Sequence, residues 1–136
     1  MIDSSLTLDY QGCRKILLQR LAEPAPGRIQ ILTGPRQVGK TTLLLDLKAQ
    51  LGDAALYEAG DDPHAALPGS WERIWSDAER QARQQRAVLL LDEAHHLGNW
   101  AKRLKGHWDR VRREHIPVHI VVSGSSSLRM GAGSRE

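Results

Sequence analysis

Residues 34–41 read Gly-Pro-Arg-Gln-Val-Gly-Lys-Thr, and they constrain the fold of this chain more than any other segment. They match the pattern G-x-x-x-x-G-K-[ST] at every fixed position, which is typical of a loop that wraps around a phosphate chain. Its two glycines let the backbone turn tightly, so that successive amide N–H groups point inward at an anion. Because such a loop works only between a strand and a helix, the motif restricts the chain to α/β architectures.

The segments on both sides of this loop meet that requirement. Residues 28–33, Arg-Ile-Gln-Ile-Leu-Thr, are short, mostly apolar and rich in β-branched side chains, and a Pro-Gly turn precedes them. Residues 41–51 are rich in helix formers and are followed by Gly52. The start of that helix would add the positive end of its dipole to the anion site.

The motif assigns chemistry to individual residues. Lys40 is predicted to reach the β- and γ-phosphates and to neutralise charge during transfer, and the Thr41 hydroxyl is predicted to bind Mg²⁺. The alternative is a glycine turn with a solvent-exposed lysine. The predicted nucleotide-binding residues are Gly34, Pro35, Arg36, Gln37, Val38, Gly39, Lys40, Thr41 and Thr42.

Length and composition predict one globular domain, residues 1–136, in which 40% of the residues are hydrophobic and 26% are charged. The net charge of +3 permits anionic ligands without arguing for nucleic acid. A single cysteine, Cys13, excludes an internal disulfide and suits a reducing compartment. No run approaches the ~20 apolar residues of a membrane span, and the first residues lack the charged start of a signal peptide. We therefore expect a cytoplasmic protein with no membrane contact.

The remaining segments alternate between helical and strand patterns. Helices are predicted over 10–23, from Ser70 as N-cap onward, and over 99–114, and strands over 54–59, 87–91 and 118–122. The apolar run at 87–91 is typical of a strand buried on both faces of a parallel sheet. In the helix after Ser70, the spacing of Trp71 and Trp75 predicts that both face the core. The alternation predicts a three-layer α/β/α fold with a mainly parallel sheet, and a nucleotide site at the carboxyl ends of the strands.

Asp92 and Glu93 follow the buried strand directly, which places two carboxylates at the ligand edge of the sheet. Asp92 suits the Mg²⁺ site, through water or directly. Glu93 would orient and deprotonate a water that attacks the γ-phosphate, so the pair favours hydrolysis over transfer to an acceptor hydroxyl. An exposed acidic strand end is the alternative.

The strand over 118–122 runs into Ser-Gly-Ser-Ser-Ser at 123–127. These hydroxyls could hydrogen-bond the γ-phosphate or the attacking water and so sense hydrolysis, whereas a flexible serine turn is the alternative. We take Ser123 as the favoured sensor and catalytic candidate and Ser125 as the second choice.

These motifs together resemble one family, the prokaryotic AAA+-like P-loop ATPases that usually carry a further C-terminal domain. The resemblance covers residues 10–128 and implies ATP as the nucleotide, Mg²⁺ as the cofactor, Asp92 and Glu93 as the Walker B pair and the serine segment as the sensor. The matching segments are GPRQVGKTT at 34–42, LDEAH at 91–95, Asn-Trp at 99–100, Lys105, Asp109 and VSGSSS at 122–127.

In that family the chain continues past the sensor through an arginine-containing segment, a fifth core strand and a second domain, whereas this sequence ends at Glu136. We therefore expect an AAA+/ASCE-type core that is incomplete at its C-terminus. Residues 29–32 would then form an uncovered sheet edge, open to self-association. Arg129 and Arg135 are poor substitutes for an arginine finger, so turnover should suffer more than binding.

Other features suggest alternatives. The basic helix segment 102–113 is either a solvated face or a contact surface for nucleic acid or protein. His95 and His96 are adjacent, but neighbouring side chains on a turn are expected to point apart, which disfavours a zinc site. No guanine-reading segment supports GTP. The main hypothesis is Mg²⁺-dependent ATP hydrolysis; the alternatives are a nucleotide-dependent switch or interaction module with little turnover, and a small-molecule phosphotransferase.

Overall fold

The computed structural model describes residues 10–25, 29–33 and 39–124. Its centre is a four-stranded sheet in which every pair of neighbouring strands is parallel. The spatial order is β1-β4-β3-β2, so the first and last strands in sequence are neighbours. The strands are β1 (Ile29–Thr33), β2 (Ala55–Ala59), β3 (Ala87–Asp92) and β4 (Val118–Gly124).

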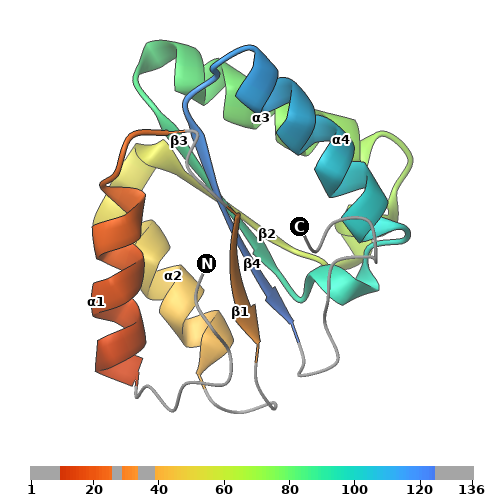
Figure 1. Ribbon diagram of the computed structural model, residues 1–136. Coiled ribbons are helices and arrows are strands. Elements are labelled where there is room, and N and C mark those ends of the chain that lie inside the picture. Colours follow the sequence, from red (N-terminus) through yellow and green to blue (C-terminus); the bar gives the residue numbers. More distant parts are fainter. Residues whose placement is uncertain (1–9, 26–28, 34–38, 125–136) are drawn as a thin grey trace.

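Helices cover both faces of this sheet. Helices α1 and α2 lie on one face and α3 and α4 on the other, so the predicted three-layer α/β/α architecture is confirmed (Figure 1). The α-helices are α1 (Tyr10–Leu21), α2 (Lys40–Leu51), α3 (Ser70–Gln84) and α4 (Trp100–Arg113). Three short 3₁₀ helices, η1 (Gly52–Ala54), η2 (Pro63–Ala66) and η3 (Ala94–His96), join them to the strands.

The start of α3 differs from its prediction. Gly69, with φ of 82°, occupies the N-cap position, and Ser70 is already the first helical residue. A left-handed conformation of this kind is open to glycine at little cost, which explains why the chain turns at Gly69. The Ser70 hydroxyl is buried, and its oxygen has no hydrogen-bond partner in the described part of the chain. Ser70 is therefore not the cap.

The alternation of side chains along β3 and β4 divides the core into two clusters. Leu89 and Val122 pack with α3 and α4, where Trp71 and Trp75 are buried as predicted. Leu90 and Val121 pack with α1 and α2. Because side chains alternate between the faces with a period of two, Asp92 and Ser123 continue the second set. Their side chains therefore lie on the face that α2 covers.

Strand β1 pairs with β4 along one edge, with Leu32 opposite Ser123 and Thr33 opposite Gly124. Among the described strands no other one pairs with β1, which makes it an edge of the observed sheet. Self-association through this edge stays a prediction.

Candidate functional site

The Asp92 carboxylate is the centre of the polar site at the end of β3. It is only 2% exposed, and both of its oxygens accept a hydrogen bond from a hydroxyl. Ser123 Oγ donates to Oδ1 over 2.5 Å, and the Tyr57 hydroxyl donates to Oδ2 over 2.6 Å. A buried carboxylate is costly unless hydrogen bonds satisfy its oxygens. Strands β2, β3 and β4 therefore supply one cluster in which the carboxylate oxygens are hydrogen-bonded.

Tyr57 was not among the predicted site residues. It lies on β2 with its Cα paired to Leu90, two residues before Asp92, so both side chains emerge on the same face of the sheet. Burial, followed by the hydrogen bond to Asp92, raises the pKa of the Tyr57 hydroxyl well above its ordinary value. The hydroxyl therefore remains a proton donor to the carboxylate. Only the pairing of β2 with β3 could have revealed this contact.

Ser123 connects the two acidic residues. Its hydroxyl donates to Asp92 and accepts from the Glu93 backbone N–H over 3.3 Å. Ser123 is completely buried within β4, so the alternative of a flexible serine turn is wrong for this residue. Ser125, the second choice for the sensor, lies outside the described residues.

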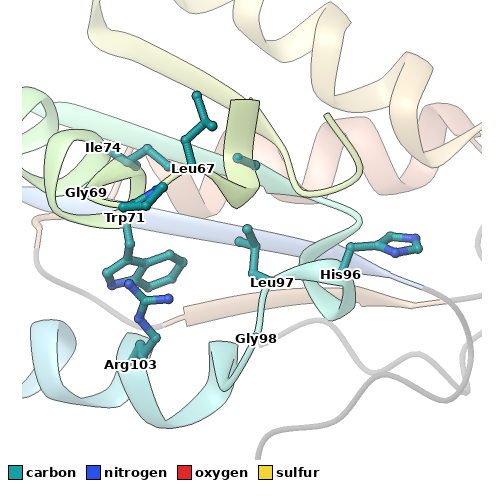
Figure 2. A pocket seen from close by; sticks show the side chains of 10 residues that line it. Leu67, Gly69, Trp71, Ile74, His96, Leu97, Gly98 and Arg103 are labelled. Atoms are coloured by element: carbon teal, nitrogen blue, oxygen red, sulfur yellow. The ribbon is translucent and has the colours of Figure 1, made fainter. Parts of the chain in front are cut away.

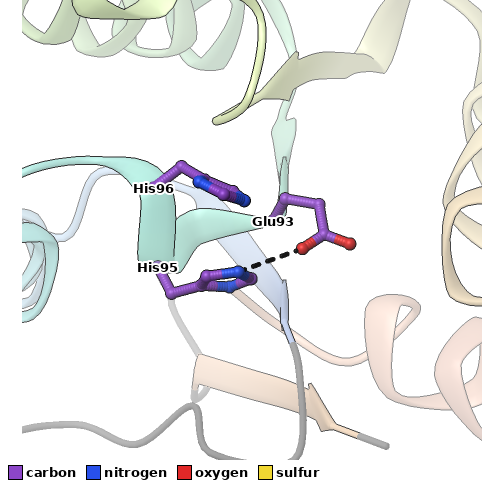
Figure 3. A group of neighbouring side chains, drawn as sticks. All are labelled: Glu93, His95 and His96. Atoms are coloured by element: carbon purple, nitrogen blue, oxygen red, sulfur yellow. Dashed lines mark ion pairs between the residues drawn. The ribbon is translucent and has the colours of Figure 1, made fainter. Parts of the chain in front are cut away.

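Glu93 lies in a different environment from Asp92, although the two are adjacent. Its backbone is left-handed, with φ of 54°, and it is the N-cap of η3. Its side chain is 22% exposed, and one carboxylate oxygen, Oε2, lies 3.3 Å from His95 Nε2 (Figure 3). The reversal at Glu93 thus turns the second carboxylate away from the buried cluster and toward solvent.

Gly60, which was not among the predicted site residues, fixes the backbone at this point. Its N–H donates to the Asp92 carbonyl over 2.6 Å, which extends the pairing of β2 with β3 by one step. A Cβ at this position would lie 2.4 Å from the Glu93 carbonyl oxygen. Only glycine allows so close an approach.

The phosphate-loop motif is described from Gly39 onward. Gly39, with φ of 86°, is the N-cap of α2, and Lys40 is its first residue, 7% exposed. Thr41 and Thr42 are exposed on the first turn of α2. The N-terminal end of α2 and the carboxyl ends of β1 and β4 lie at the same end of the sheet (Figure 1). The other predicted phosphate-binding residues, Gly34, Pro35, Arg36, Gln37 and Val38, lie outside the described residues.

A separate pocket of about 270 Å³ lies in the α3/α4 layer (Figure 2). Trp71, Ile74, Leu97 and Arg103 contribute to its lining, and the Arg103 guanidinium lies 5.1 Å from the centre of the Trp71 ring. His96 also lines it, but none of the residues predicted to bind nucleotide or Mg²⁺ or to act in catalysis does. The pocket is therefore distinct from the polar cluster at Asp92.

Much of the positive charge on α4 is paired with acidic side chains. Lys102, Arg112 and Arg113 are exposed on the same helix and remain the part of the basic segment that a partner could contact. The pairs are Arg103 with Glu72 at 3.4 Å, Lys105 with Asp109 at 3.5 Å, and Arg110 with both Glu79 and Glu114. Within the described residues, no helix is both long and apolar enough to cross a membrane.

Comparison with known proteins gives the family. A family model described as an AAA domain matches residues 26–136, and a search of curated proteins found no match. Among solved structures, PCH-2 of C. elegans resembles the chain with a TM-score of 0.53 and 21% sequence identity, over 88% of this chain and 36% of that one. This likeness supports the fold. The chain spans only 36% of the length of the PCH-2 chain. The match over residues 26–136 shows that the chain belongs to the AAA domain family, and its α/β architecture fits the P-loop NTPase fold.

Proposed function

We propose that residues 1–136 form an ATPase core that binds ATP together with Mg²⁺ and hydrolyses it. The observation that carries this proposal is the hydrogen bond from Ser123 to Asp92 at the carboxyl ends of two neighbouring strands. It sets a buried carboxylate on the face of the sheet covered by α2, the helix that follows the phosphate-loop motif. An acidic residue at this place, together with a P-loop threonine, is what a nucleotide-bound Mg²⁺ requires.

In this proposal the metal-binding groups are the Thr41 hydroxyl and the Asp92 carboxylate. These are oxygen ligands, which Mg²⁺ prefers. Each Asp92 oxygen accepts one hydroxyl hydrogen bond and keeps capacity for another, so the carboxylate suits contact with a metal-bound water. When bound, Mg²⁺ would neutralise negative charge on the β- and γ-phosphates. Lys40 and the backbone of residues 35–40 would hold those phosphates.

Glu93 is the proposed general base. Its carboxylate is partly exposed, whereas that of Asp92 is buried, so Glu93 is free to contact a water molecule. Ser123 accepts from the Glu93 N–H and donates to Asp92, which ties the backbone of the base to the metal-binding carboxylate. We propose that this link makes Ser123 the sensor of the γ-phosphate.

The proposed function can be tested by measuring phosphate release from ATP. The proteins to compare are wild type, Glu93→Gln and the control Glu72→Gln. Glu72 is an exposed helical glutamate in the opposite layer, so its variant controls for loss of one surface charge. Loss of a general base should lower kcat by at least about 100-fold while ATP binding persists. Wild-type turnover in Glu93→Gln would contradict the proposed base. A folded chain that binds ATP without turning it over would favour a nucleotide-dependent switch, and turnover only with an added acceptor would favour a phosphotransferase.

The exposed charges of Lys102, Arg112 and Arg113 favour a second candidate function, an interaction module that contacts nucleic acid or an acidic protein through α4. Reversing the charges of Arg112 and Arg113 should then abolish binding of a fluorescent oligonucleotide or acidic peptide in an anisotropy assay. Unchanged anisotropy would assign these side chains to a solvated face.

A further inference from the structure

Glu93, His95 and His96 gather at the turn that follows β3 (Figure 3). Each offers one potential metal-ligand atom, and these three atoms all lie within 4.8 Å of one another. The centres of the two imidazole rings are 4.3 Å apart. The expectation that adjacent histidines point apart is therefore wrong for this pair.

The backbone explains the convergence. Glu93 adopts a left-handed conformation, and the following residues form the single 3₁₀ turn η3. A 3₁₀ helix has about three residues per turn, so side chains three positions apart, such as those of Glu93 and His96, lie on the same side of it. The carboxylate and both rings thus come together on one side of the turn (Figure 3).

The spacing of two of these atoms matches a tetrahedral metal site. Zinc bonds of about 2.0–2.1 Å place neighbouring tetrahedral ligand atoms about 3.3–3.4 Å apart. Glu93 Oε2 and His95 Nε2 are 3.3 Å apart. His95 Nδ1 is buried, so Nε2 is the nitrogen of His95 that can face an ion. His96 is exposed, and its side chain can move the remaining distance without disturbing the core.

We propose that Glu93, His95 and His96 form a binding site for Zn²⁺ or a similar divalent transition metal. Two imidazole nitrogens and one carboxylate oxygen are a ligand set that zinc accepts, with water in the fourth position. The metal binds neutral imidazoles, so a proton is released to solvent only from a ring that was an imidazolium before binding. No other covalent change occurs.

The affinity should be moderate. A metal-binding histidine normally donates its second ring N–H to an acceptor that fixes the ring and raises its basicity. His95 Nδ1 has no such partner in the described part of the chain. We therefore expect micromolar binding, weaker than that of a structural zinc site. Bound metal would also occupy Glu93 and so inhibit hydrolysis, a consequence that rests on the proposed function, whereas the binding itself does not.

Zinc titration of the nucleotide-free, untagged chain against a chromophoric chelator tests the site. Wild type should bind one equivalent, and His96→Gln should weaken that binding at least about tenfold, since one ligand of three is lost. His64→Gln is the matched control, because His64 is also exposed and lies 3.1 Å from a carboxylate, that of Asp62. The control should bind zinc as wild type does. Cobalt should give the visible absorption of a tetrahedral site in wild type and not in His96→Gln.

Equal zinc affinity in wild type and His96→Gln would overturn the proposal. A wild-type dissociation constant above about 1 mM would also overturn it, because binding that weak does not indicate a specific site. Circular dichroism of both variants checks that they are folded. The ATPase and the metal site can be refuted separately. Zinc binding in a chain that never hydrolyses ATP would refute only the ATPase, and hydrolysis without zinc binding would refute only the metal site.

Discussion

The two faces of the sheet are built from alternate residues of the same strands, yet they differ in whether their buried polar atoms are hydrogen-bonded. On the α1/α2 face, β3 and β4 end in Asp92 and Ser123, and the polar atoms of this cluster are hydrogen-bonded to one another. On the α3/α4 face, the strands pack against Trp71 and Trp75, whose buried indole N–H groups have no partner among the described residues.

This difference indicates a division between stability and chemistry. Trp71 and Trp75 are almost completely buried, and their large aromatic area favours folding. A buried carboxylate, in contrast, persists only with its hydrogen bonds intact. We therefore expect substitutions on the α3/α4 face to affect mainly stability, and substitutions around Asp92 to affect nucleotide binding as well.

The largest effect on stability is expected for Trp75→Ala. Trp75 is 1% exposed and stacks on His107 with ring centres 4.6 Å apart, so its removal leaves a large cavity and should lower the free energy of unfolding by about 3–5 kcal/mol. Trp75→Phe should cost much less, because the indole N–H makes no hydrogen bond within the described part of the chain. Urea denaturation measures both. If the two variants were equally unstable, the inference that aromatic packing dominates stability on the α3/α4 face would be wrong.

Gly60→Ala should damage the α1/α2 face through the backbone. The new methyl group would collide with the Glu93 carbonyl, so we expect a loss of about 1–3 kcal/mol in the free energy of unfolding, together with weaker ATP turnover. Gly106→Ala, in the middle of α4, is the control, since a Cβ there meets nothing within 4 Å. It should stabilise the helix by up to about 1 kcal/mol. Equal stabilities of the two variants in thermal unfolding would show that the fold does not require glycine at position 60.

Ser123→Ala sharpens the comparison at the polar cluster. It removes one of the two hydroxyl groups that donate a hydrogen bond to Asp92. A buried carboxylate oxygen then lacks its donor, which should lower the free energy of unfolding by about 1–3 kcal/mol. Tyr57→Phe removes the other hydroxyl and should cost less, because Tyr57 is only half-buried. Both variants should also raise the Mg²⁺ concentration needed for ATP binding, measured by calorimetry. Unchanged Mg²⁺ dependence in both would separate Asp92 from the metal.

The smallest expected effect is a pH dependence of stability that arises from His107, which stacks on Trp75 on the α3/α4 face. Burial lowers the pKa of His107 below its ordinary value of 6.5. Unfolded chains therefore bind the proton more readily, and the stability contributed by neutral His107 is present above pH 6.5 and lost as the pH falls through the folded-state pKa. His107→Phe keeps an aromatic ring against Trp75 but cannot titrate, so its stability should fall less than that of wild type between pH 8 and 5. Parallel pH profiles would show that His107 does not contribute; His119, whose pKa burial also lowers, would then be tested in the same way.

Local patterns were sufficient to predict most of the fold. The apolar run at 87–91 marked β3, and the glycine-rich motif between 28–33 and 41–51 placed β1 and α2 on either side of the loop. These features depend on short stretches of chain, so they can be recognised without knowing the tertiary structure. Asp92, at the end of a buried strand, belongs with them.

Contacts between distant segments could not be predicted in this way. Tyr57 reaches Asp92 only because β2 is the neighbour of β3, and Gly60 is required only because its backbone touches that of Glu93. The convergence of His95 and His96 depends on the left-handed backbone of Glu93, an unusual conformation for a residue other than glycine. Each of these depends on strand order or on one dihedral angle.

The carboxyl ends of the strands on the α1/α2 face are the proposed site for ATP and Mg²⁺. Calorimetric titration of the chain with ATP, with and without Mg²⁺ and with Lys40→Ala alongside, tests it most directly. We expect micromolar binding that Mg²⁺ strengthens and that Lys40→Ala abolishes. A folded wild-type chain that does not bind ATP, or a Lys40→Ala variant that binds as well as wild type, would contradict it.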